Sequence, residues 1–255
     1  MTDTTVTQRR FLGLAGNTWT LILLGLGAVL TTIDLVMAFF FTPLVVGAQV
    51  AETRIINGIA VSNQLLFSQK IFYFHVPVAI ASFLVFFFTA YYGVRFLMTK
   101  EKKYDTRARI ATEVTLLFVM LTLITGDIWT RFEWGVWWVW EPRLTTYFIM
   151  TLLVIAYFVL RASIEDEERR ATYAAVFGII AFLDAPISFV ITRLIPSSVH
   201  PVVLRSGGGL TGPQLTAFLV GMAGMLMLGW VVYQVRLREE LARERIEALK
   251  ASLES

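Results

Sequence analysis

The sequence predicts an all-α integral membrane protein with six transmembrane helices. Of its 255 residues 56% are apolar and only 16% are charged, and the mean hydropathy is +0.67. Soluble domains are about 45–50% apolar, even with glycine counted, and about 25% charged. A water-soluble core of this size does not bury so much apolar surface. The composition excludes an ordinary soluble enzyme, a disordered chain and, without cysteine, a disulfide-stapled secreted domain.

Six stretches are long and apolar enough to cross a bilayer, which takes about 20 residues. They lie at about 18–41, 71–97, 111–128, 145–162, 173–192 and 213–235. The first stretch is too long for the apolar core of a signal peptide and lacks a small-x-small cleavage site. We therefore interpret it as a retained span.

The positions of lysine and arginine predict the orientation, because these residues accumulate in cytoplasmic loops. With the N-terminus in the cytoplasm, 16 of the 22 lysines and arginines fall on the cytoplasmic side and 6 on the outer side. Both termini are therefore predicted to be cytoplasmic. The predicted outer loops are about 42–70, 129–144 and 193–212. The net charge of +3 does not suggest nucleic acid as a partner.

The chain divides into a predicted membrane domain, residues 1–235, and a charged cytoplasmic helical tail, residues 236–255. The tail contains strong helix formers and the i,i+4 pair Glu239/Arg243. It is most simply a solvated extension of the last span. The alternative is a helix that docks onto a cytoplasmic partner, because four leucines make a partial apolar stripe. These are Leu237, Leu241, Leu249 and Leu253.

Tryptophan is concentrated in the second outer loop. Five of the seven tryptophans fall there, namely Trp129, Trp134, Trp137, Trp138 and Trp140. An aromatic belt at the membrane surface explains one or two tryptophans per interface, and it remains the alternative. Five in one loop favour a ligand platform. If the segment is helical, Trp134, Trp137, Trp138 and Glu141 share one face of this short amphipathic segment.

The polar end of this segment suits an anionic ligand. Glu141 and Arg143 follow the last tryptophan. Indoles stack on flat rings, and arginine pairs with carboxylates in a bidentate fashion. The platform therefore fits a large planar amphiphile that carries anionic groups.

The two histidines of the chain are His75 and His200. His75 lies in Phe74-His75-Val76-Pro77, about 8 Å inside the outer end of the second span at 1.5 Å per residue. An ionisable residue there is a functional candidate, and the alternative is a neutral histidine bonded to a neighbouring helix. His200 alone is typical of an exposed loop histidine. The topology, however, places both on the face of the tryptophan loop, where two neutral imidazoles suit the axial positions of a haem iron.

Intramembrane carboxylates suggest a different class of function. Asp34, Asp127 and Asp184 lie in predicted spans. Such residues often mark proton or ion pathways. A proton- or solute-coupled transporter is therefore the alternative function, and polar contacts between helices are the simpler explanation.

The tryptophan segment carries a family resemblance. Residues 134–145, Trp-Gly-x-Trp-Trp-x-Trp-Glu-Pro-Arg-Leu-Thr, resemble the WWD signature of haem-handling proteins in cytochrome c biogenesis. Together with the six spans, the length and the Phe74–Pro77 segment, they resemble the heme exporter protein C family (CcmC) over nearly the whole chain. Glu141 stands where the family usually has aspartate. The segment before His200 also lacks the family's tryptophan pair.

The resemblance implies a haem b site at the outer membrane face, with bis-His axial ligation of the iron by His75 and His200. The five loop tryptophans would form the platform, with Glu141 and Arg143 at its polar end. The implied role is to present haem to a membrane-anchored haem chaperone during maturation of c-type cytochromes. The implied partners are the membrane and ATPase subunits of an ABC transporter and a small single-span accessory subunit. The implied location is the bacterial inner (cytoplasmic) membrane. The protein is then not an enzyme, since ATP hydrolysis belongs to a partner.

Overall fold

The computed structural model describes residues 3–43, 53–56, 58–62, 67–195, 200 and 210–254. Within them, six helical segments are long and apolar enough to cross a membrane. These are Thr18–Phe41, Gln69–Thr99, Lys102–Glu133, Pro142–Ala162, Glu167–Leu194 and Gly212–Glu254. Each contains one predicted span, so the all-α class and the six spans are confirmed. The orientation in the membrane stays a prediction.

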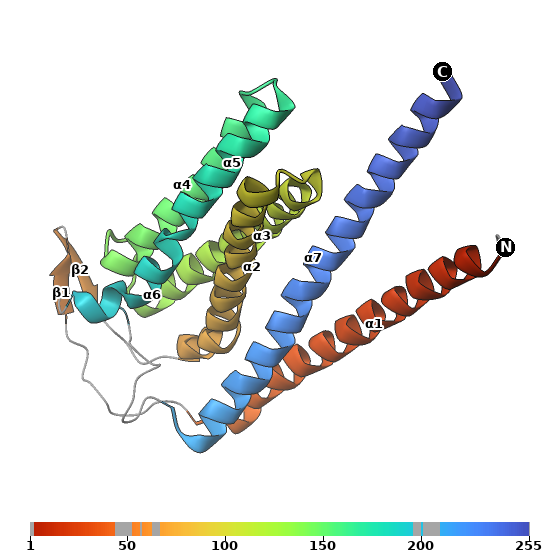
Figure 1. Cartoon of the computed structure of the whole chain (residues 1–255). Helices are drawn as coiled ribbons and strands as arrows, with labels where there is room; N and C mark the ends of the chain where they lie inside the picture. Colours follow the sequence, from red (N-terminus) through yellow and green to blue (C-terminus); the bar gives the residue numbers. More distant parts are fainter. Residues whose placement is uncertain are drawn as a thin grey trace.

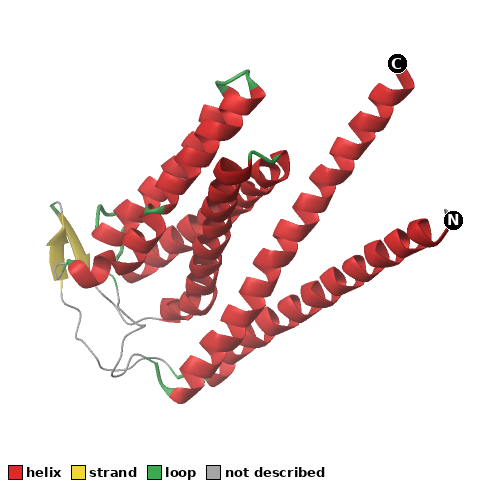
Figure 2. Ribbon diagram, in the orientation of Figure 1, coloured by secondary structure: helices red, strands yellow, loops and turns green. Residues whose placement is uncertain are grey.

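Figure 2 shows that helices make up almost all of the described chain. Helix α1 (Asp3–Val36) continues through a π-helical turn, η1 (Met37–Phe41), and a 3-10 turn, η2 (Phe67–Ile71), leads into α2 (Phe72–Thr99). The remaining helices are α3 (Lys102–Glu133), α4 (Pro142–Ala162), α5 (Glu167–Phe182), α6 (Asp184–Leu194) and α7 (Gly212–Glu254).

Helices α2 and α3 lie in the middle of the bundle (Figure 1). Helices α4, α5 and α6 pack on one side of them, and α7 packs on the other, with α1 against α7. One buried cluster joins α2, α3 and α7 around Val85, Phe118 and Met225. A second joins α2 and α3 to α4 and its neighbours around Val119 and Met150. The α2–α3 pair is therefore the common core onto which both halves pack.

The fifth span is broken into two helices. Helix α5 ends at Phe182 and α6 begins at Asp184, so Leu183 is the joint. Pro186 follows closely, and proline cannot donate the backbone hydrogen bond that a continuous helix needs there. The break turns α6 toward α4, which it contacts.

A small hairpin lies in the first predicted outer loop. Strands β1 (Thr53–Ile56) and β2 (Ile59–Ser62) pair antiparallel, with Gly58 in the turn at φ +80°. No strand was predicted here from the sequence, although β-branched residues around a glycine turn are typical of hairpins. Part of the predicted loop 42–70 and most of the loop 193–212 lie outside the described residues.

Helices α1 and α7 approach each other closely through small residues. A Cβ on Gly27 would lie 3.1 Å from the Gly224 carbonyl oxygen, and a Cβ on Gly224 would lie 2.8 Å from the Thr31 backbone nitrogen. Helices in membranes pack through such small residues because they let backbones come close. Asp34 belongs to this contact, since it is 1% exposed and lies against Gly221.

We expect Gly224→Leu to separate α1 from α7. Overpacking costs about 1–3 kcal/mol, and the helices have no room for a larger side chain here. The apparent melting temperature in detergent should fall by several degrees. Gly25→Leu is the matched control, because a Cβ on Gly25 meets nothing within 4 Å. Equal melting temperatures for the two variants would contradict the close packing.

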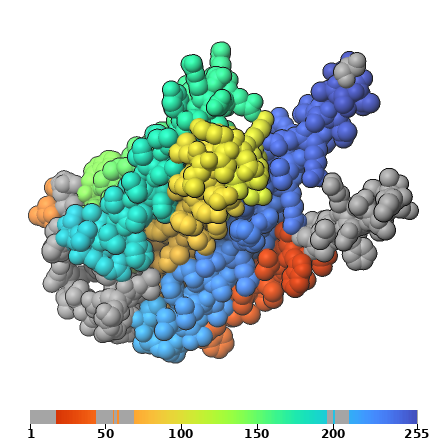
Figure 3. All heavy atoms as spheres, in the orientation of Figure 1, coloured from red at the N-terminus to blue at the C-terminus, as the bar shows by residue number. Residues whose placement is uncertain are grey.

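Helix α7 includes both the last span and the predicted tail. Leu237 is 8% exposed and packs with Leu241 against the bundle, whereas Leu249 and Leu253 are 64% and 87% exposed. The four leucines therefore do not form one free stripe, and that interpretation is wrong for the first two. The C-terminal part of α7 projects beyond the other helices (Figure 3).

An ion pair joins the first turn of α3 to the last turn of α4. Arg161 donates from Nη1 and Nη2 to the two carboxylate oxygens of Asp105, at 2.6 and 2.9 Å. The two side chains are only 11% and 13% exposed. The pair therefore holds α3 and α4 together at the end of the bundle opposite the tryptophan-rich junction, which joins the end of α3 to the start of α4.

Candidate ligand site

His75 lies in the first turn of α2 and faces α3. Its Nδ1 lies 2.9 Å from Thr125 Oγ1. A Cβ on Gly126 would lie 3.1 Å from His75 Cε1 and would press on the ring. The hydrogen-bond contact with a neighbouring helix is the one that the alternative explanation of His75 predicts, and through it α3 holds the imidazole in place.

His200 lies beside the start of α4 and is not an exposed loop histidine, because its side chain is only 14% exposed. Its ring centroid is 5.8 Å from that of Trp129 and 6.2 Å from that of Trp134. Its Nδ1 is 3.6 Å from Glu141 Oε1. Burial lowers the pKa of the His200 imidazole, and the neighbouring Glu141 carboxylate offsets this effect only partly. The ring is therefore neutral at neutral pH, which is the form that ligates a metal.

The two histidines belong to one end of the bundle. His75 contacts Thr125 on α3, and His200 packs against Trp129, one turn further along the same helix. Their elements are far apart in the sequence, and the α3–α4 junction lies between them in chain order. The fold thus brings to one end of the bundle two groups that the sequence separates by nearly half of its length.

The tryptophan-rich segment is not helical. Helix α3 ends at Glu133, and residues 134–140 form a turn followed by irregular chain. Gly135 has φ +77°, which ends a helix, and Glu141 is extended before Pro142, as residues before proline usually are. The prediction that Trp134, Trp137, Trp138 and Glu141 share a helical face is therefore wrong. Instead the Thr130 hydroxyl contacts the Trp137 carbonyl oxygen at 2.8 Å and holds the segment against α3.

Four of the five tryptophans form two groups rather than one flat surface. Trp129 and Trp134 meet edge to face at 5.0 Å beside His200, and Trp134 is 1% exposed. Trp138 and Trp140 pack edge to face with each other and with Phe148 of α4. Trp137 and Trp140 are 62% and 55% exposed. The inner pair, Trp129 and Trp134, packs beside His200. The outer group, Trp138 and Trp140 with Phe148, presents the ring of Trp140 at the surface.

Glu141 and Arg143 both hold the structure together. Glu141 is the N-cap of α4, since its Oε1 accepts a hydrogen bond from Leu144 N at 2.6 Å. Pro142 follows at the first helical position, where proline is favoured. Arg143 donates from Nη2 to Phe189 O and Thr192 Oγ1, both at 3.0 Å, and so ties α4 to α6. Neither of these roles was predicted from the sequence.

Buried N–H groups indicate what the site would bind. Trp134 Nε1, Trp138 Nε1 and Arg143 Nε are buried and have no hydrogen-bond partner among the described residues. Leaving such a donor unsatisfied costs about 1–3 kcal/mol. Since all three are donors, a ligand with anionic oxygens would supply what they lack.

Two residues that the sequence analysis missed contact His75, namely Thr125 and Gly126. Thr125 and Gly126 precede Trp129 by four and three residues, so helix α3 places all three residues on the same side. That spacing is the signal that would have found them. The identity of their partner required the packing of α2 against α3.

The carboxylates of the transporter alternative do not converge. Asp34 lies on α1 against α7, whereas Asp184 begins α6, on the other side of the α2–α3 pair. Asp127 belongs to α3 itself. The three carboxylates therefore lie on three different helices, and within the described residues no contact joins them.

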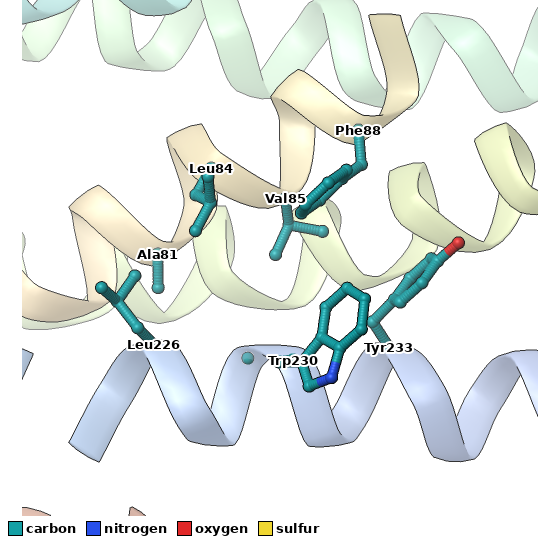
Figure 4. Close-up of a pocket in the computed structure, with 8 residues that line it drawn as sticks. Ala81, Leu84, Val85, Phe88, Leu226, Trp230 and Tyr233 are labelled. Atoms are coloured by element: carbon teal, nitrogen blue, oxygen red, sulfur yellow. The ribbon is translucent and has the colours of Figure 1, made fainter. Parts of the chain in front are cut away.

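A cavity between α2 and α7 lies apart from the histidines and tryptophans of the candidate site. Figure 4 shows its lining, which includes Val85, Phe88, Trp230 and Tyr233. Its volume is about 20 Å³, which is enough for one water molecule. It is too small for a planar ligand, so we interpret it as a gap in packing.

Fold and site together define a class: a six-span helical membrane protein with two histidines and a tryptophan-rich junction at one end of the bundle. The profile of the family described as Heme exporter protein C matches residues 2–252. The chain belongs to this family.

Curated relatives agree with this assignment. The Heme exporter protein C of Paracoccus denitrificans is 26% identical over 185 residues, which cover 71% of this chain and 77% of the relative. That of Rhodobacter capsulatus is 26% identical over 219 residues, which cover 85% and 84%. A putative cytochrome c biosynthesis ccmC-like mitochondrial protein of Arabidopsis thaliana is 28% identical over 189 residues, which cover 71% and 72%.

Proposed function

We propose that this protein binds haem b at the outer face of the membrane, with His75 and His200 as the axial ligands of the iron. The observation that carries the proposal is that His75, His200 and the Trp129–Trp134 indole pair lie at the same end of the bundle, beside a junction that holds buried indole and guanidinium N–H groups. Bound haem supplies an iron that takes two imidazole nitrogens and a macrocycle that takes indole contacts. The family name agrees with this ligand.

The chain's own residues would bind and orient the ligand. His200 is neutral and therefore ready to ligate. Trp129 and Trp134 pack beside His200, while Arg143 and the indole N–H groups supply donors for the two propionates. None of these roles needs a turnover step by this chain, so we propose a haem-binding and haem-transfer protein rather than an enzyme.

The proposal extends to the transfer of haem to a membrane-anchored chaperone during maturation of c-type cytochromes. The exposed rings of Trp137 and Trp140 give the site an accessible edge that a partner can reach. We further propose a location in the bacterial inner membrane and a complex with the membrane and ATPase subunits of an ABC transporter and a single-span accessory subunit. Family membership supports these partners.

An absorption spectrum tests the haem assignment. The protein would be expressed with haem available, purified in detergent and reduced with dithionite. We expect a Soret band and the sharp visible bands of six-coordinate, low-spin haem with two histidine ligands. Absence of a Soret band, in protein that stays folded by gel filtration, would refute the proposal.

A double substitution tests the outer tryptophans. We expect Trp137→Ala with Trp138→Ala to lower haem affinity about tenfold, because aromatic contacts contribute about 0.5–1.5 kcal/mol each beyond buried area. Haem content per protein after gel filtration measures the effect. Trp19→Ala with Trp230→Ala is the matched control, because these two tryptophans lie outside the candidate site. Equal haem contents in the two double variants would rule out a platform role.

A further inference from the structure

The hydroxyl of Thr125 has three polar neighbours. Its Oγ1 lies 2.8 Å from Leu121 O, 3.2 Å from Thr122 O and 2.9 Å from His75 Nδ1. A threonine hydroxyl has one hydrogen to donate and two lone pairs to accept. One hydrogen therefore has to be assigned among three contacts.

The backbone carbonyls settle this assignment, because a carbonyl oxygen only accepts. If the hydroxyl hydrogen pointed at His75, two close oxygen–oxygen contacts would be left without a hydrogen between them. The favourable arrangement has Thr125 donating to Leu121 O and accepting from His75 Nδ1–H. A neutral imidazole protonated at Nδ1 keeps its lone pair at Nε2.

Gly126 sets the position of the same ring. A Cβ there would lie 3.1 Å from His75 Cε1, which is tighter than about nine in ten real Cβ contacts. Thr125 and Gly126 are consecutive on α3, so one turn of one helix fixes both the hydrogen bond and the space of the ring. Both residues belong to the α2–α3 pair, which is the core onto which the other helices pack.

We propose that Thr125 is a positioning residue that fixes the tautomer of His75 and makes Nε2 the atom that ligates the haem iron. This inference rests on the proposed function. A hydrogen bond to the far nitrogen of a ligating histidine orients the ring and raises its basicity. The more basic ligand favours ferric over ferrous iron. Thr125 thereby sets the affinity for haem and its reduction potential without touching it.

The test compares Thr125→Val, which keeps the shape and removes the acceptor, with Thr125→Ser, which keeps the hydroxyl. Thr115→Val is the matched control, because Thr115 is fully buried on the same helix and its hydroxyl donates to Ala111 O. Haem affinity, the midpoint potential of bound haem and the melting temperature of the haem-free protein are measured for each variant.

We expect Thr125→Val to lower haem affinity about tenfold and to make the midpoint potential more positive. Thr125→Ser should restore both values, and Thr115→Val should change neither. Thr125→Ala also lacks the acceptor and should match the valine variant, which covers the case that valine disturbs packing.

The outcomes separate this inference from the haem assignment. Wild-type affinity and potential in both Thr125→Val and Thr125→Ala would overturn the role of Thr125 while haem binding stands. A shift of equal size in Thr115→Val would also overturn it, since any buried threonine would then have the effect. A wild-type protein without haem would overturn both proposals.

Discussion

Replacing either histidine with alanine is expected to change both the amount and the spectrum of bound haem. Removing an outer hydrogen-bond partner of a metal ligand costs about 10- to 100-fold in affinity, and removing the ligand itself should cost more. Either His75→Ala or His200→Ala should leave a five-coordinate, high-spin haem in the protein that retains it. The double variant should retain none after gel filtration. Spectra of the oxidised and reduced forms measure both effects.

Added imidazole provides the control for this pair. Each single substitution leaves space where a free imidazole fits, so millimolar imidazole should restore the six-coordinate spectrum in both single variants. Thr115→Val, buried in α3, should keep the wild-type spectrum throughout. Wild-type spectra in both histidine variants would refute the ligand assignment, although haem binding by other residues would stand.

The second large effect concerns stability at the opposite end of the bundle. Arg161→Ala leaves the Asp105 carboxylate, 13% exposed, without its bidentate partner. Breaking a buried pair by removing one member costs about 3–5 kcal/mol, because the remaining charge is uncompensated. For a chain of this size that corresponds to a fall in melting temperature of about 10 °C. Thermal unfolding in detergent, followed by tryptophan fluorescence, measures it.

Two further variants isolate the cause. Arg161→Lys keeps the positive charge but loses the planar guanidinium group. Its melting temperature should therefore lie between those of the wild-type protein and Arg161→Ala. Lys102→Ala removes an ion pair with Glu167 in which both side chains are more than 60% exposed, and exposed pairs contribute about 0–1 kcal/mol. A fall in Lys102→Ala as large as in Arg161→Ala would show that charge loss at this end, rather than burial, decides the result.

The spans could be predicted because they depend on length and apolarity alone. Each predicted span lies inside an observed helix, and the errors are at the ends, where charged residues extend α3 and α7 as helix. The break at Leu183 and the hairpin were not predicted. Both depend on local turn chemistry around Pro186 and Gly58, which an average over 20 residues conceals.

The candidate site was predicted as a set of residues rather than as a geometry. Helical spacing placed four side chains on one face of the tryptophan segment, but Gly135 and Pro142 impose a turn and an extended residue instead. The burial of His200 depends on contacts with Trp129 and Trp134, which lie more than 60 residues earlier in the chain. Thr125 and Gly126 lie against His75 only because α2 packs on α3, so their role could not be predicted from the sequence of α3 alone.

The double use of Glu141 limits how this site can be engineered. One carboxylate both starts α4 and lies beside His200, so a substitution made to adjust ligand binding at this position also weakens the beginning of a transmembrane helix. A substitution of Arg143 would likewise weaken the structure, because this side chain donates hydrogen bonds to α6. The Trp137 side chain has no such structural role, because its ring is largely exposed. The segment is held instead by the backbone carbonyl of Trp137, which accepts from the Thr130 hydroxyl. Variation in haem handling can therefore be introduced at position 137 at little cost to assembly of the protein in the membrane.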